Sequence, residues 1–291
     1  MRLKFKKNDN KDSHKCQTTV YLNGGLGNQL FQFGNGIEIS RTRNSSLYLD
    51  TTHLVQDVKR DYALDIFEIP QNKSFELSGS RISLTGQDSK CTCEPIHLRE
   101  ADFFYSDYTS QMHQKGQLFL HGYWQSSLYF QKSSELIMNF LNQSLISQTE
   151  TGYAVMHIRR GDFLSDSRTR EFHGILDIEY YSRAVRIISK EINKIYLVSD
   201  NFSEASKILS QLAVLFPQID FILAEEKMSE KECISIMAYA SFVITANSSF
   251  SWWGSYLGVE KTVIAPRNYF SSKTLRINNI TDLYPSGWIL I

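Results

Sequence analysis

The chain has 291 residues, and its 31 Lys and Arg are balanced by 31 Asp and Glu, so its formal net charge is zero. A neutral chain has no long-range field of one sign, which excludes nucleic acid or an anionic membrane surface as an expected main partner. The hydrophobic fraction of 42% is ordinary for a globular protein, and the length allows two medium-sized domains.

The first 17 residues are polar and basic, and they hold no apolar run of the kind found in signal peptides. No stretch of about 18 apolar residues follows, so no membrane-spanning helix is expected. Residues 1–17 are expected to form a disordered tail, with weak binding to acidic lipid headgroups as the alternative. The expected location is the cytoplasm, with a peripheral contact at the inner face of the membrane as a second expectation.

The cysteines do not have the spacing of a zinc or redox motif. They are Cys16, Cys91, Cys93 and Cys233. We therefore expect free thiols in a reducing compartment and no metal site.

The first half of the chain begins as an α/β protein. Residues 19–22 form a β-branched and aromatic run that predicts a strand, and the glycine-rich residues 23–28 end it. Apolar residues at helical spacing predict a helix over 29–41, with Leu30, Phe33, Ile37 and Ser40 on its buried face. The other elements expected here are strands at 47–50 and 117–121 and a helix at 134–145. Residues 70–115 are polar and irregular, and we assign no elements to them.

The second half alternates short apolar strands with amphipathic helices. The predicted strands cover residues 153–158, 194–198, 219–223, 242–245 and 262–265. The predicted helices cover 177–192, residues from 203 onward with Ile208, Leu212 and Leu215 inward, 229–239 and 249–258. Asp177 is expected to cap the first helix, and Ser229 with Glu232 to form a capping box on the third. This alternation predicts a parallel sheet with both faces covered, and two α/β domains joined near residues 146–152.

Polar segments follow four of the predicted strands. They are the glycine turn at 23–28, Arg159-Arg160-Gly161-Asp162, Ser199-Asp200-Asn201 and the serine loop at 247–251. Because ligands of open parallel sheets bind beyond the C-terminal ends of the strands, we expect all four segments to meet at one edge.

Each segment is suited to a particular chemistry. Arg159 and Arg160 can bind phosphate oxygens with two hydrogen bonds each. Asp162 is suited either to orienting an arginine or to accepting a proton. Ser248, Ser249 and Ser251 precede helical residues, so they predict an anion site at a helix start, with a plain serine cap as the alternative.

Several further residues have two interpretations. Gly25 and Gly27 allow a ligand to approach the backbone, although a glycine turn alone is a weak signal. Tyr123, Trp124 and Gln125 suit the faces and hydroxyls of a sugar, and the hydrophobic core is the competing interpretation. His157 is either a core histidine or a ligand contact, whereas Trp252 and Trp253 are expected in the core.

Three long motifs resemble the α-1,2-fucosyltransferases, glycosyltransferase family 11. They are Asn23-Gly24-Gly25-Leu26-Gly27-Asn28-Gln29-Leu30-Phe31-Gln32, His157-Ile158-Arg159-Arg160-Gly161-Asp162 and Asn247-Ser248-Ser249-Phe250-Ser251-Trp252-Trp253. Gly122-Tyr123-Trp124-Gln125-Ser126 is also similar to the family's pattern. The resemblance runs from about Val20 to about Phe270, and the arginine motif is also similar to one in α-1,6-fucosyltransferases.

The resemblance implies a fold, a donor and a reaction. The fold would be α/β and GT-B-like, with two Rossmann-like domains facing an interdomain cleft: residues 18–148 on the acceptor side and 149–291 on the donor side. The donor would be GDP-L-fucose, and inverting transfer would place fucose on the 2-hydroxyl of a terminal β-galactoside. The acceptor would be a galactose-terminated oligosaccharide, lipid-linked forms included, in surface polysaccharide or O-antigen synthesis. The resemblance also implies that no metal or other cofactor would be needed.

The same resemblance implies site residues. By this resemblance His157 would contact the nucleotide and Arg159 would bind the β-phosphate. From the chemistry of the residues themselves, Arg159 and Asp162 are expected to be the catalytic pair. The expected donor-binding set is His157, Arg159, Arg160, Asp200, Asn247, Ser248, Ser249, Phe250, Ser251, Gly25, Gly27, Asn28 and Gln29. The expected acceptor-side set is Tyr123, Trp124, Gln125 and His173.

Other functions stay open at this point. The chain could use another GDP-sugar, hydrolyse a GDP-sugar, or bind a carbohydrate or nucleotide sugar without turnover. The arginine pair argues against a simple lectin, which has no use for phosphate-binding groups. The general base is also open, with Asp162 as first candidate and then Glu171 and His173. Acceptor identity and oligomeric state are not readable from the sequence.

Overall fold

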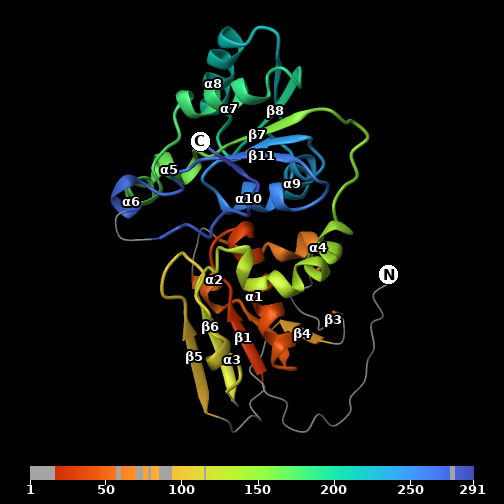
Figure 1. The fold of residues 1–291 in the computed structure, drawn as a ribbon, viewed down its shortest axis with the longest axis vertical. Coiled ribbons are helices and arrows are strands. Elements are labelled where there is room, and N and C mark those ends of the chain that lie inside the picture. Colours follow the sequence, from red (N-terminus) through yellow and green to blue (C-terminus); the bar gives the residue numbers. More distant parts are fainter. Residues whose placement is uncertain are drawn as a thin grey trace. The chain divides into compact units, whose positions relative to one another are not determined.

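The computed structural model describes residues 17–56, 60–69, 75–77, 80–84, 94–114, 116–275 and 279–291. Residues 1–16 of the expected tail lie outside these ranges, and Gln17 is the first residue of strand β1. The chain divides into two compact units (Figure 1). The first unit ends at Ile137 and includes Thr281–Leu283, and the second comprises Met138–Ile280 and Tyr284–Ile291. The division falls inside helix α4, Ser134–Asn142, rather than between residues 148 and 149.

The first unit is built on a six-stranded sheet with the order β3-β4-β2-β1-β6-β5. Its strands are β1 (Gln17–Tyr21), β2 (Ser46–Asp50), β3 (Phe75–Leu77), β4 (Ser80–Leu84), β5 (Pro95–Arg99) and β6 (Gln117–His121). All neighbours are parallel except β3 and β4. The sequence predicted β1, β2 and β6 but not the others. Strand β5 escaped prediction because it lies at the edge and buries only Leu98.

Helix α1 (Leu26–Thr42) is the central helix of this unit. Its predicted apolar face is buried, but so are nearly all its other residues. An added Cβ at Gly36 would lie 2.7 Å from a Val20 methyl carbon and 2.9 Å from one of Leu47, so a glycine is needed for this close approach to the sheet. The shorter helices of the unit are α2 (Thr52–Gln56), η1 (Leu64–Phe67), α3 (Thr109–Met112) and η2 (Ser127–Ser133).

The second unit has a fully parallel sheet with the order β12-β11-β10-β7-β8-β9. Its strands are β7 (Ala154–Ile158), β8 (Lys194–Ser199), β9 (Asp220–Leu223), β10 (Phe242–Ile244), β11 (Thr262–Ala265) and β12 (Ile289–Leu290). Counted along the chain, this is the 3-2-1-4-5-6 order of a Rossmann fold, whose switch point lies between β7 and β10. The predicted α/β class with two Rossmann-like units is therefore confirmed, whereas the expected cleft between them stays a prediction.

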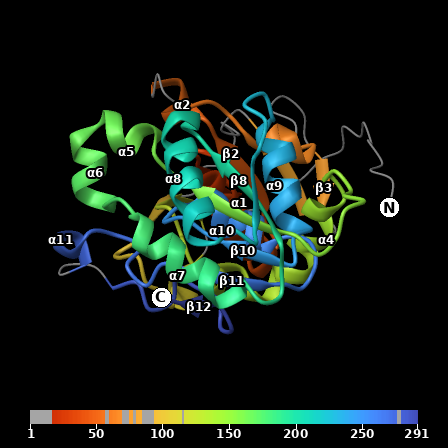
Figure 2. The same ribbon diagram turned by 90° about the horizontal axis from the view of Figure 1, so that it is seen from above.

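Helices cover both faces of this sheet (Figure 2). Helices α7 (Ile178–Ile188) and α8 (Phe202–Leu215) pack on one face, and α9 (Glu230–Ala238) and α10 (Ser249–Tyr256) on the other. The predicted caps are confirmed, because Asp177 accepts a hydrogen bond from the Tyr180 amide and Ser229 forms a capping box with Glu232. Three short helices were not predicted: α5 (Gly161–Ser165), α6 (Ser167–His173) and α11 (Ser272–Leu275).

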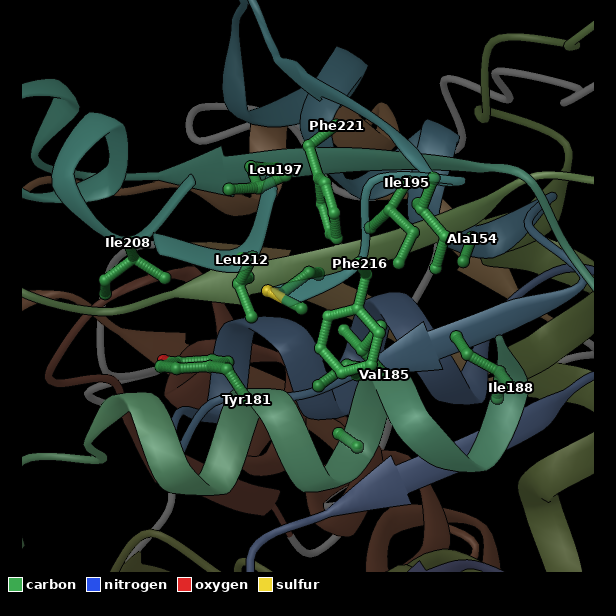
Figure 3. Close-up of a cluster of buried hydrophobic side chains, with 14 of the residues drawn as sticks. Ala154, Tyr181, Val185, Ile188, Ile195, Leu197, Ile208, Leu212, Phe216 and Phe221 are labelled. Carbon is green, nitrogen blue, oxygen red and sulfur yellow. The ribbon is translucent and has the colours of Figure 1, made fainter. Parts of the chain in front are cut away.

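The core of the second unit lies under α7 and α8 (Figure 3). Leu212 on α8 is fully buried there beside Val185 and Phe216. The prediction that Leu215 also points inward is wrong, because that side chain is 53% exposed. Helix α8 ends at Leu215, and the next residue, Phe216, fills the core in its place.

The expectations about membrane-spanning helices and cysteines can be compared with the described residues. No described helix is both long and apolar enough to cross a bilayer. Cys233 is a free, half-buried thiol, and the other three cysteines lie outside the described residues.

The two leucines near the end of α8 offer a matched test of this core. Replacing Leu212 by Ala leaves a cavity and should lower the free energy of unfolding by about 2–5 kcal/mol. Leu215→Ala on the same helix should change it by less than about 0.5 kcal/mol. Urea unfolding of both variants checks this, and equal losses would show that the buried face is assigned wrongly.

Candidate active site

Three of the four polar segments meet at the switch point of the second unit. Strand β7 pairs with β10 on one side and with β8 on the other. The residues after these strands, Arg159–Gly161, Thr245–Ser251 and Asp200, therefore follow neighbouring strand ends. The fourth segment, the glycine turn, belongs to the sheet of the first unit, so the expectation that all four share one sheet edge is wrong.

An ion pair between Arg159 and Asp200 lies at the centre of this group. An Nη atom of Arg159 is 2.8 Å from a carboxylate oxygen of Asp200, and the two side chains are 21% and 25% exposed. The guanidinium also lies over the ring of Phe163, 5.7 Å from its centre. These contacts hold the arginine at the end of β7 while leaving part of its surface in solvent.

Asp200 also holds the backbone of the neighbouring loop. Its second oxygen accepts a hydrogen bond from the Arg160 amide at 2.8 Å. Burial pushes the pKa of Asp200 up, but Arg159 and the amides of Arg160 and Gly161 hold that pKa below its ordinary value. An added Cβ at Gly161 would lie 2.5 Å from the carboxylate, so no larger residue fits there.

Two buried polar atoms lie beside this ion pair. Among the described residues, neither Nδ1 of His157 nor Oγ1 of Thr245 has a hydrogen-bond partner. His157 is on β7, and Thr245 directly follows the adjacent strand β10. Buried polar atoms without partners also occur elsewhere among the described residues, for example at Asn35, so these two indicate a ligand site only together with their position at neighbouring strand ends.

His157 is held in its neutral form. Burial lowers its pKa to about 4, with Asp200 acting against the shift and Arg159 adding to it. The neutral ring, which lies 5.7 Å from the ring of Phe250, can accept and donate one hydrogen bond each at neutral pH.

Arg160 is placed differently from its neighbour. The side chain is buried, and its guanidinium donates to the carbonyl oxygens of Arg159 and Leu176 at 3.0 and 2.5 Å. It was expected to bind donor phosphate, but its observed contacts fasten the loop after β7 to the segment before α7.

The serine loop divides into buried and half-buried residues. Asn247 is buried and donates to the carbonyl oxygens of His173 and Tyr269, and buried Ser251 accepts from the Ala246 amide. Both side chains shape the loop from within. Ser248, Ser249 and Phe250 are half-buried at the start of α10, where Ser248 caps the helix by accepting from the Phe250 amide.

The candidate bases are less well placed. Glu171 is exposed and pairs with Lys273 on the surface. His173 stacks on Phe163 with ring centres 4.9 Å apart and also contacts Phe172 and Phe270. Asp162 lies in α5, but its side chain is outside the described part of the structure.

The glycine turn starts α1 at the switch point of the first unit, between β1 and β6. Gly25 is its N-cap, and Gly24 has a φ of +73° that favours glycine. Gln29 was expected to bind the donor, but it is buried and donates to the carbonyl oxygens of Gly24 and Asp61. Asn28 is half-buried and accepts from the Gln125 side chain at 2.7 Å. Gly27 is buried in the first turn of α1.

The expected acceptor-side residues 123–125 differ in exposure. Tyr123 is 38% exposed, whereas Trp124 and Gln125 are buried. Trp124 packs edge-on against Tyr108 and Tyr129, as expected for a residue of the hydrophobic core. The expectation that Trp252 and Trp253 belong to the core is confirmed.

Among the described residues, no three His, Cys, Asp or Glu side chains gather as metal ligands would.

The sequence model of glycosyl transferase family 11 matches residues 2–291. The chain belongs to glycosyl transferase family 11. The family resemblance drawn from the three motifs is thereby confirmed, and the chain is a glycosyltransferase.

Two relatives from Escherichia coli have low sequence identity to this chain but match it over nearly its whole length. An Escherichia coli α-1,2-colitosyltransferase is 27% identical over 292 residues, which cover 93% of this chain and 97% of the relative. The E. coli O-antigen biosynthesis glycosyltransferase WbnK is 25% identical, with coverage of 92% and 98%. Among solved structures, the fucosyltransferase NodZ from Bradyrhizobium is similar with a TM-score of 0.48 and 12% identity, covering 84% of this chain and 93% of that one.

Several residues of the site were missed or given another role from the sequence. Phe163 and Thr245 carried no signal, because an aromatic and a threonine near strand ends are common. Asp200 was expected to bind the donor, but it anchors Arg159. Its position directly after β8 was the available signal, since a carboxylate there can reach an arginine after the neighbouring strand.

The pKa of His157 predicts how stability depends on pH. Because the pKa is lower in the folded protein than in the unfolded chain, stability is fully present above about pH 6.5 and is lost as the pH falls toward about 4. The free energy of unfolding should fall by up to about 3 kcal/mol over this pH range. His157→Gln cannot titrate, so this part of the pH dependence should vanish in urea unfolding between pH 4 and 7. Exposed His113→Gln is the control, and identical slopes for wild type and H157Q would contradict the assignment.

Proposed function

We propose that this glycosyltransferase moves L-fucose from GDP-β-L-fucose, with inversion, to the 2-hydroxyl of a terminal β-galactoside. The observation that carries the proposal is Arg159, held by Asp200 at the switch point of a Rossmann-like sheet beside the start of α10. The three motifs shared with α-1,2-fucosyltransferases support the donor and the linkage. The O-antigen relative supports an oligosaccharide acceptor, free or lipid-linked, in surface polysaccharide synthesis.

The leaving group is a nucleoside diphosphate, and negative charge grows on it as the sugar–oxygen bond breaks. In this proposal Arg159 and the amides at the start of α10 take that charge. Preorganised donors of this kind stabilise a transition state by roughly 3–4 kcal/mol each. The sequence has no Asp-x-Asp pair to hold a divalent metal, so transfer is proposed to be metal-independent.

The other second-unit residues are proposed to act around this arginine. Neutral His157 and Thr245 offer buried hydrogen-bonding atoms to the nucleotide. Arg160, Asn247 and Ser251 hold the loops in shape through their observed contacts, and their direct contact with the donor stays a prediction. Ser248, Ser249 and Phe250 are the residues of the loop that are proposed to meet it.

The acceptor hydroxyl must lose a proton, and Asp162 stays our first candidate for the base. Glu171 is less favoured because it is paired on the surface, and His173 because aromatic rings surround it. For the acceptor, Tyr123 is the exposed member of its group and is proposed to contact the sugar.

One relative suggests a different donor sugar for this chain. The colitosyltransferase relative suggests the 3-deoxy form of L-fucose, which differs from fucose only at that hydroxyl. A direct test incubates the protein with GDP-L-fucose or its 3-deoxy analogue and with a panel of β-galactosides, with and without EDTA. We expect a deoxyhexose on O2 of galactose by mass and NMR, with EDTA having no effect. Release of free sugar, or GDP binding without any product, would favour the hydrolase or the non-catalytic binder.

Arg159→Ala should lower kcat by roughly 10²–10³-fold, because a preorganised donor to the leaving group is lost. Arg159→Lys should recover only part of the rate, since an ammonium lacks the forked geometry. Arg168→Ala, an exposed arginine on α6, is the matched control and should keep full activity. Near-normal turnover of a folded R159A variant would defeat the role assigned to this residue.

Asp162→Asn separates the two roles open to that residue. A general base predicts unchanged GDP affinity with transfer reduced by about 10²–10⁴-fold. A collapse of GDP affinity in titration calorimetry would instead show that Asp162 orients the donor site.

A further inference from the structure

A half-buried carboxylate contacts the loop that follows β6 in the first unit. Glu100 comes directly after β5, and its two carboxylate oxygens accept hydrogen bonds from successive backbone amides of that loop. The Tyr123 amide donates at 2.6 Å and the Trp124 amide at 2.9 Å. The Glu100 amide in turn donates to the carbonyl oxygen of His121, the last residue of β6. Hydrogen bonds in both directions therefore join Glu100 to the backbone at the end of β6 and in the loop that follows.

The backbone of this loop is unusual, and the Glu100 side chain lies close against it. Trp124 has a φ of +57°, a left-handed conformation that bulky residues rarely adopt unless their surroundings impose it. An added Cβ at Gly122 would lie 2.4 Å from Cβ of Glu100, so the glycine is needed for Glu100 to come this close. The Trp124 ring is fully buried between Tyr108 and Tyr129, which fixes the other side of the loop.

The same loop is bonded to the glycine turn. The Gln125 side chain donates to Asn28, and the Gln32 side chain donates to the Gly122 carbonyl while accepting from the Asn23 amide. Glu100 thus anchors a network that reaches both motif segments of the first unit.

We propose that Glu100 is a positioning residue that holds the loop Gly122–Gln125 in the shape that binds the acceptor, and that its protonation weakens acceptor use. The acceptor part of this inference rests on the proposed function. A carboxylate can accept from both amides, whereas a carboxylic acid directs a proton toward one of them.

The surroundings place this protonation near neutrality. Burial raises the pKa of Glu100 to about 7, opposed by the loop amides and helped by the charge of Asp102. Tyr129 of η2 lies close enough for the Glu100 charge to raise its pKa. Acceptor kcat/KM should therefore fall as the pH drops through about 7, because the bonding carboxylate is lost.

Kinetics of Glu100→Gln test the inference. The variant cannot ionise, so we expect acceptor kcat/KM to fall about tenfold or more, donor KM to stay unchanged, and the step near pH 7 to disappear. Glu100→Asp restores a carboxylate and should restore a pH-dependent step. Glu94→Gln, an exposed glutamate just before β5, is the control. Wild-type acceptor kinetics and pH profile in folded E100Q would overturn the proposal.

Amide hydrogen exchange gives a readout that needs no activity. After correction for the intrinsic pH dependence, the Tyr123 and Trp124 amides of the wild type should be less protected at pH 6 than at pH 8, and weakly protected at both in E100Q. A response of these amides without transfer to any acceptor would refute the proposed function and keep the loop role. Protection that does not change with pH in the wild type would refute the proposed effect of protonation, even if E100Q failed to fold, and full protection of both amides in folded E100Q would refute the loop role.

Discussion

The carboxylate of Asp200 is the contact on which the proposed donor site depends. One oxygen holds the guanidinium of Arg159, and the other accepts from the backbone that follows β7. An arginine without such a partner would sample many rotamers, and ordering it at the moment of binding would reduce affinity. Because the pair is only partly exposed, its attraction is screened less than that of a surface ion pair. Arg159 is therefore in place before a phosphate arrives.

The two units use the same device. In each, the residue directly after a strand is a carboxylate: Asp200 after β8 and Glu100 after β5. Each carboxylate accepts from backbone amides of the loop after the adjacent parallel strand, and each lies against a glycine, Gly161 or Gly122, that has no room for a side chain. The two sites differ in their electrostatics, since Arg159 lies beside Asp200, whereas burial is the largest influence on Glu100. This explains why the pKa of Asp200 is lowered and that of Glu100 is raised.

The sequence predicted the second unit well because its signals are local. Buried parallel strands appear as short apolar runs, and the caps at Asp177 and Ser229 depend on residues three positions apart. The first unit was harder to predict, since β5 buries little and the Glu100 contact joins residues far apart in the chain. Spacing cannot show which polar side chains the fold uses internally, so it gave no sign of the internal contacts of Arg160 and Gln29, whose expected contact with the donor stays a prediction. Only the tertiary structure shows that carbonyl groups of the protein take up their hydrogen bonds.

In the proposed reaction Arg159 recognises the terminal phosphate of the nucleotide without help from a metal. Titration calorimetry of GDP and GMP in the presence of EDTA, on wild type and Arg159→Ala, isolates that phosphate. We expect the wild type to prefer GDP over GMP by about tenfold or more, equivalent to about 1.4 kcal/mol, and the variant to lose this preference while keeping its GMP affinity. An unchanged preference in the variant, or one that appears only when a divalent metal is added, would contradict this role of Arg159.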